Sequence, residues 1–131
     1  MTTFILPNAL EPLHTALQSH DDEALIVVCY CAAWCNTCAA YQTQFEALAT
    51  QFSQHCFVWV DIEENEELLG DEDVDNFPTL LLQNKKGTLF FGPLLPHIEH
   101  LQQLLEHHED MPPQPDNGPG DFIALVRAAA Q

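Results

Sequence analysis

Two short stretches of the chain, residues 24–31 and 56–62, are apolar throughout except for Asp61. The first reads ALIVVCYC and the second CFVWVDI, so both are rich in β-branched and aromatic side chains. Continuous apolar runs of this length predict strands that are buried on both faces, as in a parallel sheet. A shorter apolar run at residues 2–6 predicts one more strand near the start of the chain.

A β-hairpin is predicted further along the chain, where two strand-like runs, residues 79–83 and 88–91, are separated by a short turn segment. The two runs flank the sequence Asn84-Lys85-Lys86-Gly87, and a turn glycine between two strand-like runs is a hairpin signal. The hairpin makes part of the predicted sheet antiparallel.

Helices are predicted where apolar residues recur at spacings of three and four: from Asn8, and at residues 37–54, 97–108 and 121–130. The apolar positions of the four helices are, in order, Leu10, Leu13 and Leu17; Phe45, Leu48, Ala49 and Phe52; Ile98, Leu101, Leu104 and Leu105; Phe122, Leu125, Val126 and Ala129. The acid-rich segment 63–75 predicts a short helix and a loop. Because strands and helices alternate, the pattern predicts an α/β layer fold with a mixed sheet.

Residues 111–120, MPPQPDNGPG, contain four prolines and two glycines, a composition typical of a linker. We therefore divide the chain into a domain at residues 1–110, a linker at residues 111–120 and a helical tail at residues 121–131. The tail either covers an apolar patch of its own domain or docks on a partner, and the sequence leaves both open.

The charge of the chain narrows the classes of partner. Its 131 residues include 20 acidic and only three basic ones, with a formal net charge of −17. Nucleic-acid backbones and anionic membranes need clustered Lys and Arg, so the composition excludes both as partners. We find neither a membrane-spanning run nor a secretory signal and expect a cytoplasmic location, where cysteines rarely form structural disulfides.

Four of the five cysteines fall within residues 29–38, and the last two form the sequence Cys35-Asn36-Thr37-Cys38. This sequence follows a predicted buried strand and opens a predicted helix. The free N–H groups and positive dipole end of a helix start stabilise a thiolate. We expect Cys35 to attack a target disulfide and Cys38 to resolve the mixed disulfide.

With Trp34 before it, this sequence resembles the WCxxC motif of the thioredoxin family, and two further motifs fit: Phe77-Pro78-Thr79 before a strand, and Gly92 after the last strand. The resemblance covers about residues 2–108 and implies a thioredoxin-like three-layer fold, a central mixed β-sheet flanked by helices, here with an extra C-terminal helix. It also implies a cis Pro78 facing the disulfide. Trp34, Phe77 and Pro78 would shape the substrate groove.

The chain departs from the family pattern at several positions. Asn36-Thr37 replaces the usual Gly-Pro between the two cysteines, and Cys29 stands where thioredoxins carry a buried aspartate. That aspartate is a candidate for moving the proton of Cys38, which would here need water or a backbone group. Thr43 replaces a helix-kinking proline, so an unkinked second helix is expected.

The sequence allows more than one role for Cys29 and Cys31. The two alternate with Tyr30 and so point to one face of their strand, where the simplest interpretation is small buried core residues. An alternative interpretation joins them with Cys35 and Cys38 in a metal or iron–sulfur site, and a second disulfide or a resolving role is a further alternative. His97 and His100 have metal-compatible spacing, but a solvated helix face is the preferred interpretation.

The sequence thus predicts a thiol–disulfide oxidoreductase that reduces protein disulfides through Cys35 and Cys38 without a bound cofactor. Electrons would come from a thioredoxin-reductase-type donor or a small thiol. The acidic surface favours substrates that are neutral or basic around their disulfide. Two alternatives come from other classes: the metal or iron–sulfur module, and an adaptor or chaperone with a thioredoxin fold that binds a dedicated partner.

Overall fold

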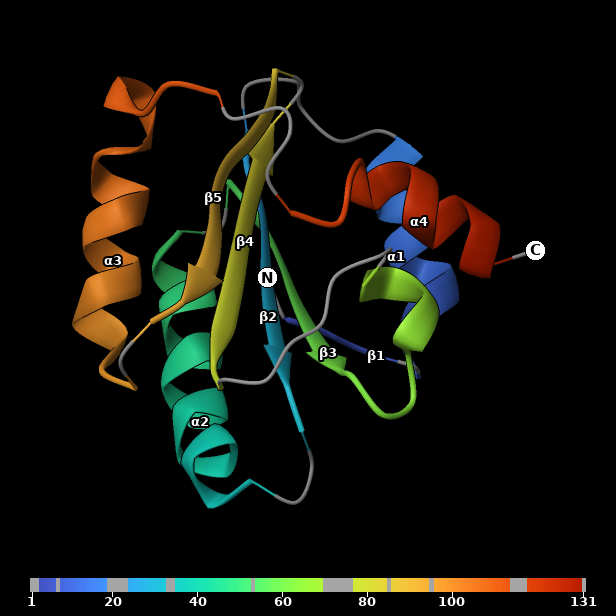
Figure 1. Cartoon of the computed structure of the whole chain (residues 1–131), viewed down its shortest axis with the longest axis horizontal. Helices are drawn as coiled ribbons and strands as arrows, with labels where there is room; N and C mark the ends of the chain where they lie inside the picture. The colour runs from blue at the N-terminus through green and yellow to red at the C-terminus, as the bar shows by residue number, and fades with distance from the viewer. Residues whose placement is uncertain are drawn as a thin grey trace.

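The computed structural model of the chain describes residues 3–6, 8–18, 24–32, 35–52, 54–69, 77–84, 86–94, 96–113 and 118–130 (Figure 1). The elements are β1 (Phe4–Leu6), α1 (Leu10–Gln18), β2 (Ile26–Cys31), α2 (Asn36–Gln51), β3 (Cys56–Asp61), the 3₁₀ turn η1 (Glu66–Leu69), β4 (Thr79–Asn84), β5 (Gly87–Pro93), α3 (Ile98–Glu106), the 3₁₀ turn η2 (His108–Asp110) and α4 (Phe122–Ala129). This order confirms the predicted alternation of strands and helices. Among the described residues, no helix is both long and apolar enough to cross a membrane.

The strands form one mixed sheet in the order β1-β3-β2-β4-β5. β2 pairs with β3 in parallel and with β4 antiparallel, so it lies at the centre of the sheet. All six residues of β2 are buried, which explains the uninterrupted apolar run in its sequence. The predicted hairpin is confirmed as the antiparallel pair β4 and β5.

One face of the sheet packs against α2 and α3. Alternate residues of the β2 segment, Leu25, Val27, Cys29 and Cys31, point to this side and join Phe45 and Leu48 of α2 and Leu101 and Leu105 of α3 in a single buried cluster. Phe52, the last member of the predicted stripe of α2, packs against the same cluster while partly exposed. α2 continues unbroken through Thr43 and ends at Gln51, three residues earlier than predicted.

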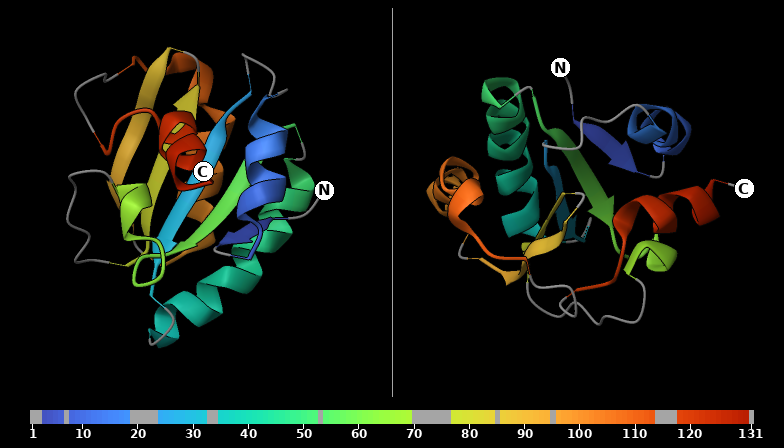
Figure 2. Two further views of the ribbon diagram at one scale, coloured as in Figure 1. Left: turned by 90° about the vertical axis from the view of Figure 1, so that its right-hand side faces the viewer. Right: turned by 90° about the horizontal axis from the view of Figure 1, so that it is seen from above.

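The opposite face of the sheet is covered by α1, η1 and α4, which lie side by side in both views of Figure 2. Between β3 and Leu69, where the described part of this segment ends, the chain forms the 3₁₀ turn η1, and α4 from the end of the chain packs between this turn and α1. Phe122 and Val126 of α4 are fully buried against Tyr30, Leu13 and Leu81 in the second core cluster. The C-terminal helix therefore docks on its own domain.

Gln83 on β4 fixes the start of α4. Its side-chain oxygen accepts a hydrogen bond from the N–H of Phe122 at 2.9 Å, and its amide nitrogen donates to the carbonyl of Gly120 and to the hydroxyl of Thr88. The carboxylate of Asp121 caps the helix by accepting from the N–H of Ile123. These bonds satisfy backbone groups at the point where α4 enters the core.

Candidate redox site

The site is built where β2 ends and α2 begins. Cys31 is the last residue of β2, Cys35 is the N-cap of α2, and Cys38 lies in the first turn of the helix. The N–H of Cys35 donates to the carbonyl of Ala32 at 3.1 Å, and the carbonyl of Cys35 accepts the first helical hydrogen bond, from Ala39. This turn folds the helix back over the strand and brings the cysteines together.

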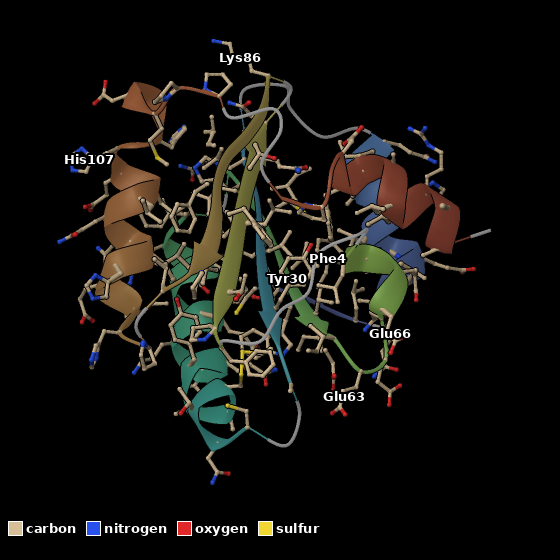
Figure 3. All side chains as sticks on the ribbon, viewed as in Figure 1. Phe4, Tyr30, Glu63, Glu66, Lys86 and His107 are labelled. Atoms are coloured by element: carbon tan, nitrogen blue, oxygen red, sulfur yellow. A yellow bond between two sulfur atoms is a disulfide. The ribbon has the colours of Figure 1, made fainter. Side chains whose placement is uncertain are left out.

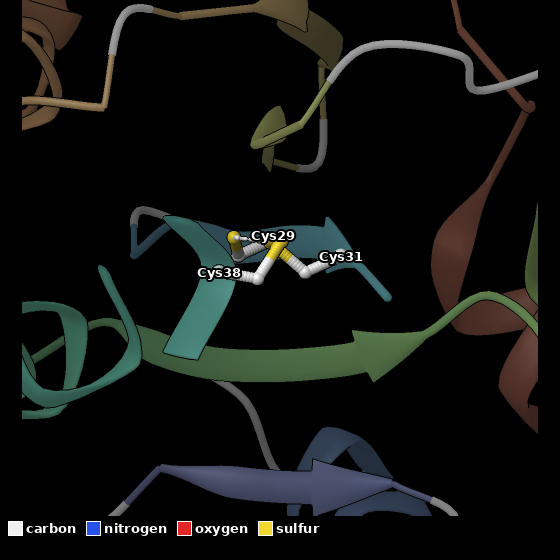
Figure 4. Close-up of a disulfide and its surroundings, with 3 residues drawn as sticks. All are labelled: Cys29, Cys31 and Cys38. Carbon is white, nitrogen blue, oxygen red and sulfur yellow. Dashed lines mark hydrogen bonds between the residues drawn. A yellow bond between two sulfur atoms is a disulfide. The ribbon is translucent and has the colours of Figure 1, made fainter. Parts of the chain in front are cut away.

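Cys38 forms a disulfide with Cys31, seven residues earlier in the chain (Figure 4). The Cα atoms of the pair are 5.8 Å apart, within the usual range for a disulfide. Cys35 is a free thiol. The interpretation of Cys31 as a small core residue is therefore right about its burial and wrong about its bonding. The disulfide of this structure joins Cys38 to Cys31, a pairing that the sequence did not predict, and leaves Cys29 and Cys35 as free thiols.

The three sulfurs differ in accessibility. Cys31 and Cys38 are 1% and 2% exposed, whereas Cys35 is half-buried at the start of the helix. A molecule approaching from solvent therefore meets Cys35, and the disulfide lies behind it in the core.

The other two cysteines, Cys29 and Cys56, are buried core residues, which for Cys29 agrees with the simplest interpretation of its sequence position. The sulfur of Cys29 lies 3.9 Å from that of Cys31, and complete burial raises the pKa of Cys29 well above its usual range. Burial likewise raises the pKa of Cys56, on the other face of the sheet, to about 12. Neither thiol ionises near neutral pH, so neither acts as a base or nucleophile there.

Phe77 and Pro78 lie at the same end of the sheet as the cysteines. Tyr30 in β2 pairs with Thr79 in β4, so the residue before Thr79 continues the register beside Cys31. The Phe77–Pro78 peptide bond is cis, as the family resemblance implied. Phe77 and Cys35 both pack, partly exposed, against the core cluster that holds the disulfide. Trp34, the third predicted groove residue, lies outside the described residues.

Acidic side chains border this end of the sheet. β3 runs parallel to β2, and Asp61 at its end pairs in register with Cys31. The exposed carboxylates of Glu63, Glu64, Glu66 and Glu67 follow directly. Lys86 lies at the far end of the molecule, in the β4–β5 turn (Figure 3). The acid-rich field is thus close to the cysteines, and this cation is remote from them.

Tyr41 is a neighbour of the site that was not among the residues predicted from the sequence. Its hydroxyl is buried and has no hydrogen-bond partner within the described part of the chain. Burial is the main reason that the pKa of Tyr41 is raised, with smaller contributions from the Cys29 and Glu99 charges. The signal was present in the sequence, since a residue three positions after Cys38 lies on the same face of a helix.

The sulfur cluster does not have the arrangement of a metal centre. Two of the four sulfurs that the sequence offered are joined in the disulfide. Across the residues that the structure describes, no group of three or more His, Cys, Asp or Glu side chains is arranged to hold a metal ion. His97, the N-cap of α3, and His100 in its first turn are both exposed, with ring centroids 6.2 Å apart, consistent with a solvated helix face.

Comparison with known proteins identifies the family. Residues 10–91 match the thioredoxin family, and the chain belongs to it. Thioredoxin H-type 2 of Nicotiana tabacum is 30% identical over 88 residues, which cover 67% of this chain and 74% of that protein. Thioredoxin-1 of Caenorhabditis elegans is 29% identical over 85 residues, covering 65% and 74%.

Solved structures agree with this assignment. Fasciola hepatica thioredoxin superposes with a TM-score of 0.65 at 25% identity, over 82% of this chain and 99% of that chain. Thioredoxin f2, from a complex with ferredoxin:thioredoxin reductase, gives a TM-score of 0.67 over 82% and 96%, and at 13% identity it supports the fold alone. The protein thus has the predicted thioredoxin-like fold and belongs to a family of thiol–disulfide oxidoreductases.

Proposed function

We propose that this protein reduces disulfides of target proteins, with Cys35 as the nucleophile and Cys38 as the resolving thiol. The observation that carries the proposal is the half-buried free thiol of Cys35 at the N-cap of α2, one helical turn from a second cysteine that forms disulfides. The first N–H groups of a helix have no intrahelical partner and, with the helix dipole, stabilise a thiolate at this position.

The reaction begins with the Cys38 thiol reduced. The Cys35 thiolate attacks one sulfur of the target disulfide, forms a mixed disulfide and releases the first target thiolate. Cys38 then attacks the sulfur of Cys35 and releases the second target thiolate. The target gains two electrons and the protein becomes oxidised.

Cys38 must lose its proton before it can attack. The neighbouring Cys29 is a neutral thiol whose pKa burial raises, so it offers no base for this step. The proton of Cys38 therefore passes to water or a backbone group. We expect resolution of the mixed disulfide to be slow, since the family's buried aspartate is replaced by Cys29.

Target recognition is proposed to use Trp34, Phe77 and Pro78 as a groove for an extended peptide. Phe77 packs on the same core cluster as Cys35, which supports a binding surface shared with the nucleophile. The acidic side chains that follow β3 would favour targets that are neutral or basic around their disulfide.

Electrons are proposed to come from a thioredoxin-reductase-type donor or a small thiol, with no bound cofactor. A structural relative, thioredoxin f2, was solved with ferredoxin:thioredoxin reductase. A reducing compartment, the cytoplasm, suits a dithiol that must be returned to its reduced form. The adaptor alternative loses its motivation, since α4 packs on its own domain.

Dithiothreitol-driven insulin reduction tests the proposal. Cys35→Ser should abolish the activity of the full-length protein, while Cys56→Ala, a change at a buried free cysteine on the other face of the sheet, should keep it. Full activity in Cys35→Ser would contradict the proposal.

A further inference from the structure

Cys38 has two candidate partners in this fold, and the disulfide joins it to the one that does not face solvent. We propose that Cys31 is a third redox cysteine, which replaces Cys35 as the disulfide partner of Cys38. The oxidised protein then keeps its disulfide in the buried core. This inference rests on the proposed function, because Cys35 and Cys38 must first react with a target.

The exchange needs no additional oxidant or reductant. Once target reduction has produced a Cys35–Cys38 disulfide, the Cys31 thiolate attacks the sulfur of Cys38. The Cys31–Cys38 bond forms, the Cys35–Cys38 bond breaks, and Cys35 leaves as a thiolate. Cys31 gives up one proton and the departing Cys35 can take one, so the number of electrons and protons on the protein is unchanged.

The position of Cys38 allows this change of partner. It lies in the first turn of α2, one helical turn from Cys35 at the N-cap, and directly over the end of β2, where its Cα is 5.8 Å from that of Cys31. Cys38 is therefore the central sulfur of three. Cys29 is not an equivalent partner, since its sulfur is 3.9 Å from that of Cys31 and remains a free thiol.

Because the Cys31–Cys38 disulfide is buried, its reduction from solvent must proceed through Cys35. Both sulfur-bearing residues of the disulfide are at most 2% exposed, so a reductant from solvent reaches them only after Cys35 has attacked Cys38 and released Cys31. The oxidised protein then has a property that an ordinary Cys35–Cys38 disulfide would not give it. Its accessible cysteine is a free thiol, ready to form mixed disulfides but without a resolving partner.

The number of accessible thiols in the oxidised protein tests the inference. Reduced full-length protein is oxidised with one equivalent of diamide, labelled with N-ethylmaleimide without denaturation, and then cleaved with chymotrypsin. Cleavage after Tyr30, Trp34 and Tyr41 places Cys31 on the peptide 31–34, and Cys35 and Cys38 together on the peptide 35–41. A Cys31–Cys38 bond therefore joins two peptides, whereas a Cys35–Cys38 bond lies within one.

We expect about one label per oxidised chain, on Cys35, together with the joined peptides 31–34 and 35–41. In Cys31→Ala the label on Cys35 should disappear and the disulfide should lie within 35–41. Cys29→Ala is the matched control, on the same strand and face and equally buried, and should label as the wild type does.

An oxidised wild-type protein with a Cys35–Cys38 disulfide and no label on Cys35 would overturn the inference. The wild-type map decides this even if Cys31→Ala fails to fold. Activity of Cys35→Ser in the insulin assay is a separate result, which would overturn the proposed function whichever disulfide the map finds.

Discussion

Thr79, the first residue of β4, lies opposite Tyr30 in β2, and this pairing brings Pro78 to the level of the Cys31–Cys38 disulfide. The two segments are 48 positions apart in the chain, from Tyr30 to Pro78. Antiparallel pairing of β2 and β4 is therefore what joins the predicted groove residues to the redox cysteines. The site depends on the register of the sheet, and the stability of the sheet depends in turn on both of its covering layers.

The entry of the chain into α4 gives a prediction about stability. Gly118 has φ +88°, and a Cβ atom there would lie 3.2 Å from a ring carbon of Phe91. Gly120 has φ +93°, but nothing lies within 4 Å of its would-be Cβ. Gly120→Ala should lower the free energy of unfolding by about 1–2 kcal/mol through backbone strain alone.

Gly118→Ala should lower the free energy of unfolding by roughly 1–3 kcal/mol more than Gly120→Ala does, because Phe91 must also move. Urea titration of the two variants checks the difference. Equal losses in both would show that the packing of the linker end against β5 contributes nothing.

Two buried tyrosines give a second matched pair. The Tyr30 hydroxyl donates to the carbonyl of Leu68 at 3.0 Å, whereas that of Tyr41 has no partner among the described residues. Tyr30→Phe should lower the free energy of unfolding by about 1–3 kcal/mol, because it leaves a buried carbonyl unsatisfied. Tyr41→Phe should change it by less than about 0.5 kcal/mol or raise it. Thermal unfolding of the reduced proteins compares them, and a larger loss in Tyr41→Phe would contradict the assignment.

Buried thiols should make the reduced protein less stable in alkali. Burial raises the pKa of Cys56 to about 12. In the unfolded chain a cysteine ionises near pH 8.5, so above that pH the unfolded state binds fewer protons than the folded state and becomes favoured. The contribution of Cys56 to stability is thus complete at lower pH and falls by about 1.4 kcal/mol per pH unit between about pH 9 and 12.

Cys56→Ala should remove this part of the slope. Urea unfolding under reducing conditions at pH 8, 9 and 10 measures the slope in both proteins. The same slope in wild type and variant would mean that Cys56 is ionisable in the folded state.

Much of the fold follows from the sequence, because its hydrophobic pattern is regular. The unbroken apolar run of β2 and the spaced leucines of α3 each have one structural solution, and both were predicted. The docking of α4 could not be predicted, since an amphipathic helix after a proline-rich linker does not reveal which surface it covers. Gln83, which bonds to Phe122 and Gly120, has no signal in a single sequence.

The cysteines show the same limit at the site. Spacing brought Cys35 and Cys38 together on one helix turn, and alternation placed Cys29 and Cys31 on one face of a strand. Which sulfur bonds to Cys38 depends on how closely α2 approaches β2, a tertiary distance of 5.8 Å between Cα atoms. Sequence spacing does not contain that distance, so the Cys31–Cys38 pairing was not predicted.

Charge should affect the choice of substrate. The carboxylates that follow β3 border the redox end of the sheet, and Lys86 lies at the other end. Reduced protein should therefore react faster with cystamine, a cationic disulfide, than with an anionic disulfide of similar size, by roughly tenfold at low salt. The ratio should shrink toward one at high ionic strength, because salt screens exposed charges. Stopped-flow tryptophan fluorescence follows both reactions, and equal rates at low salt would refute the prediction.

The central claim, that Cys35 attacks the target and Cys38 resolves the intermediate, is tested most directly by trapping the mixed disulfide. The reduced variants Cys38→Ala and Cys35→Ala are each mixed with insulin, and non-reducing mass spectrometry measures the covalent adduct. The account predicts that Cys38→Ala accumulates an adduct through Cys35 and that Cys35→Ala forms none. An adduct in Cys35→Ala, or none in Cys38→Ala, would contradict it.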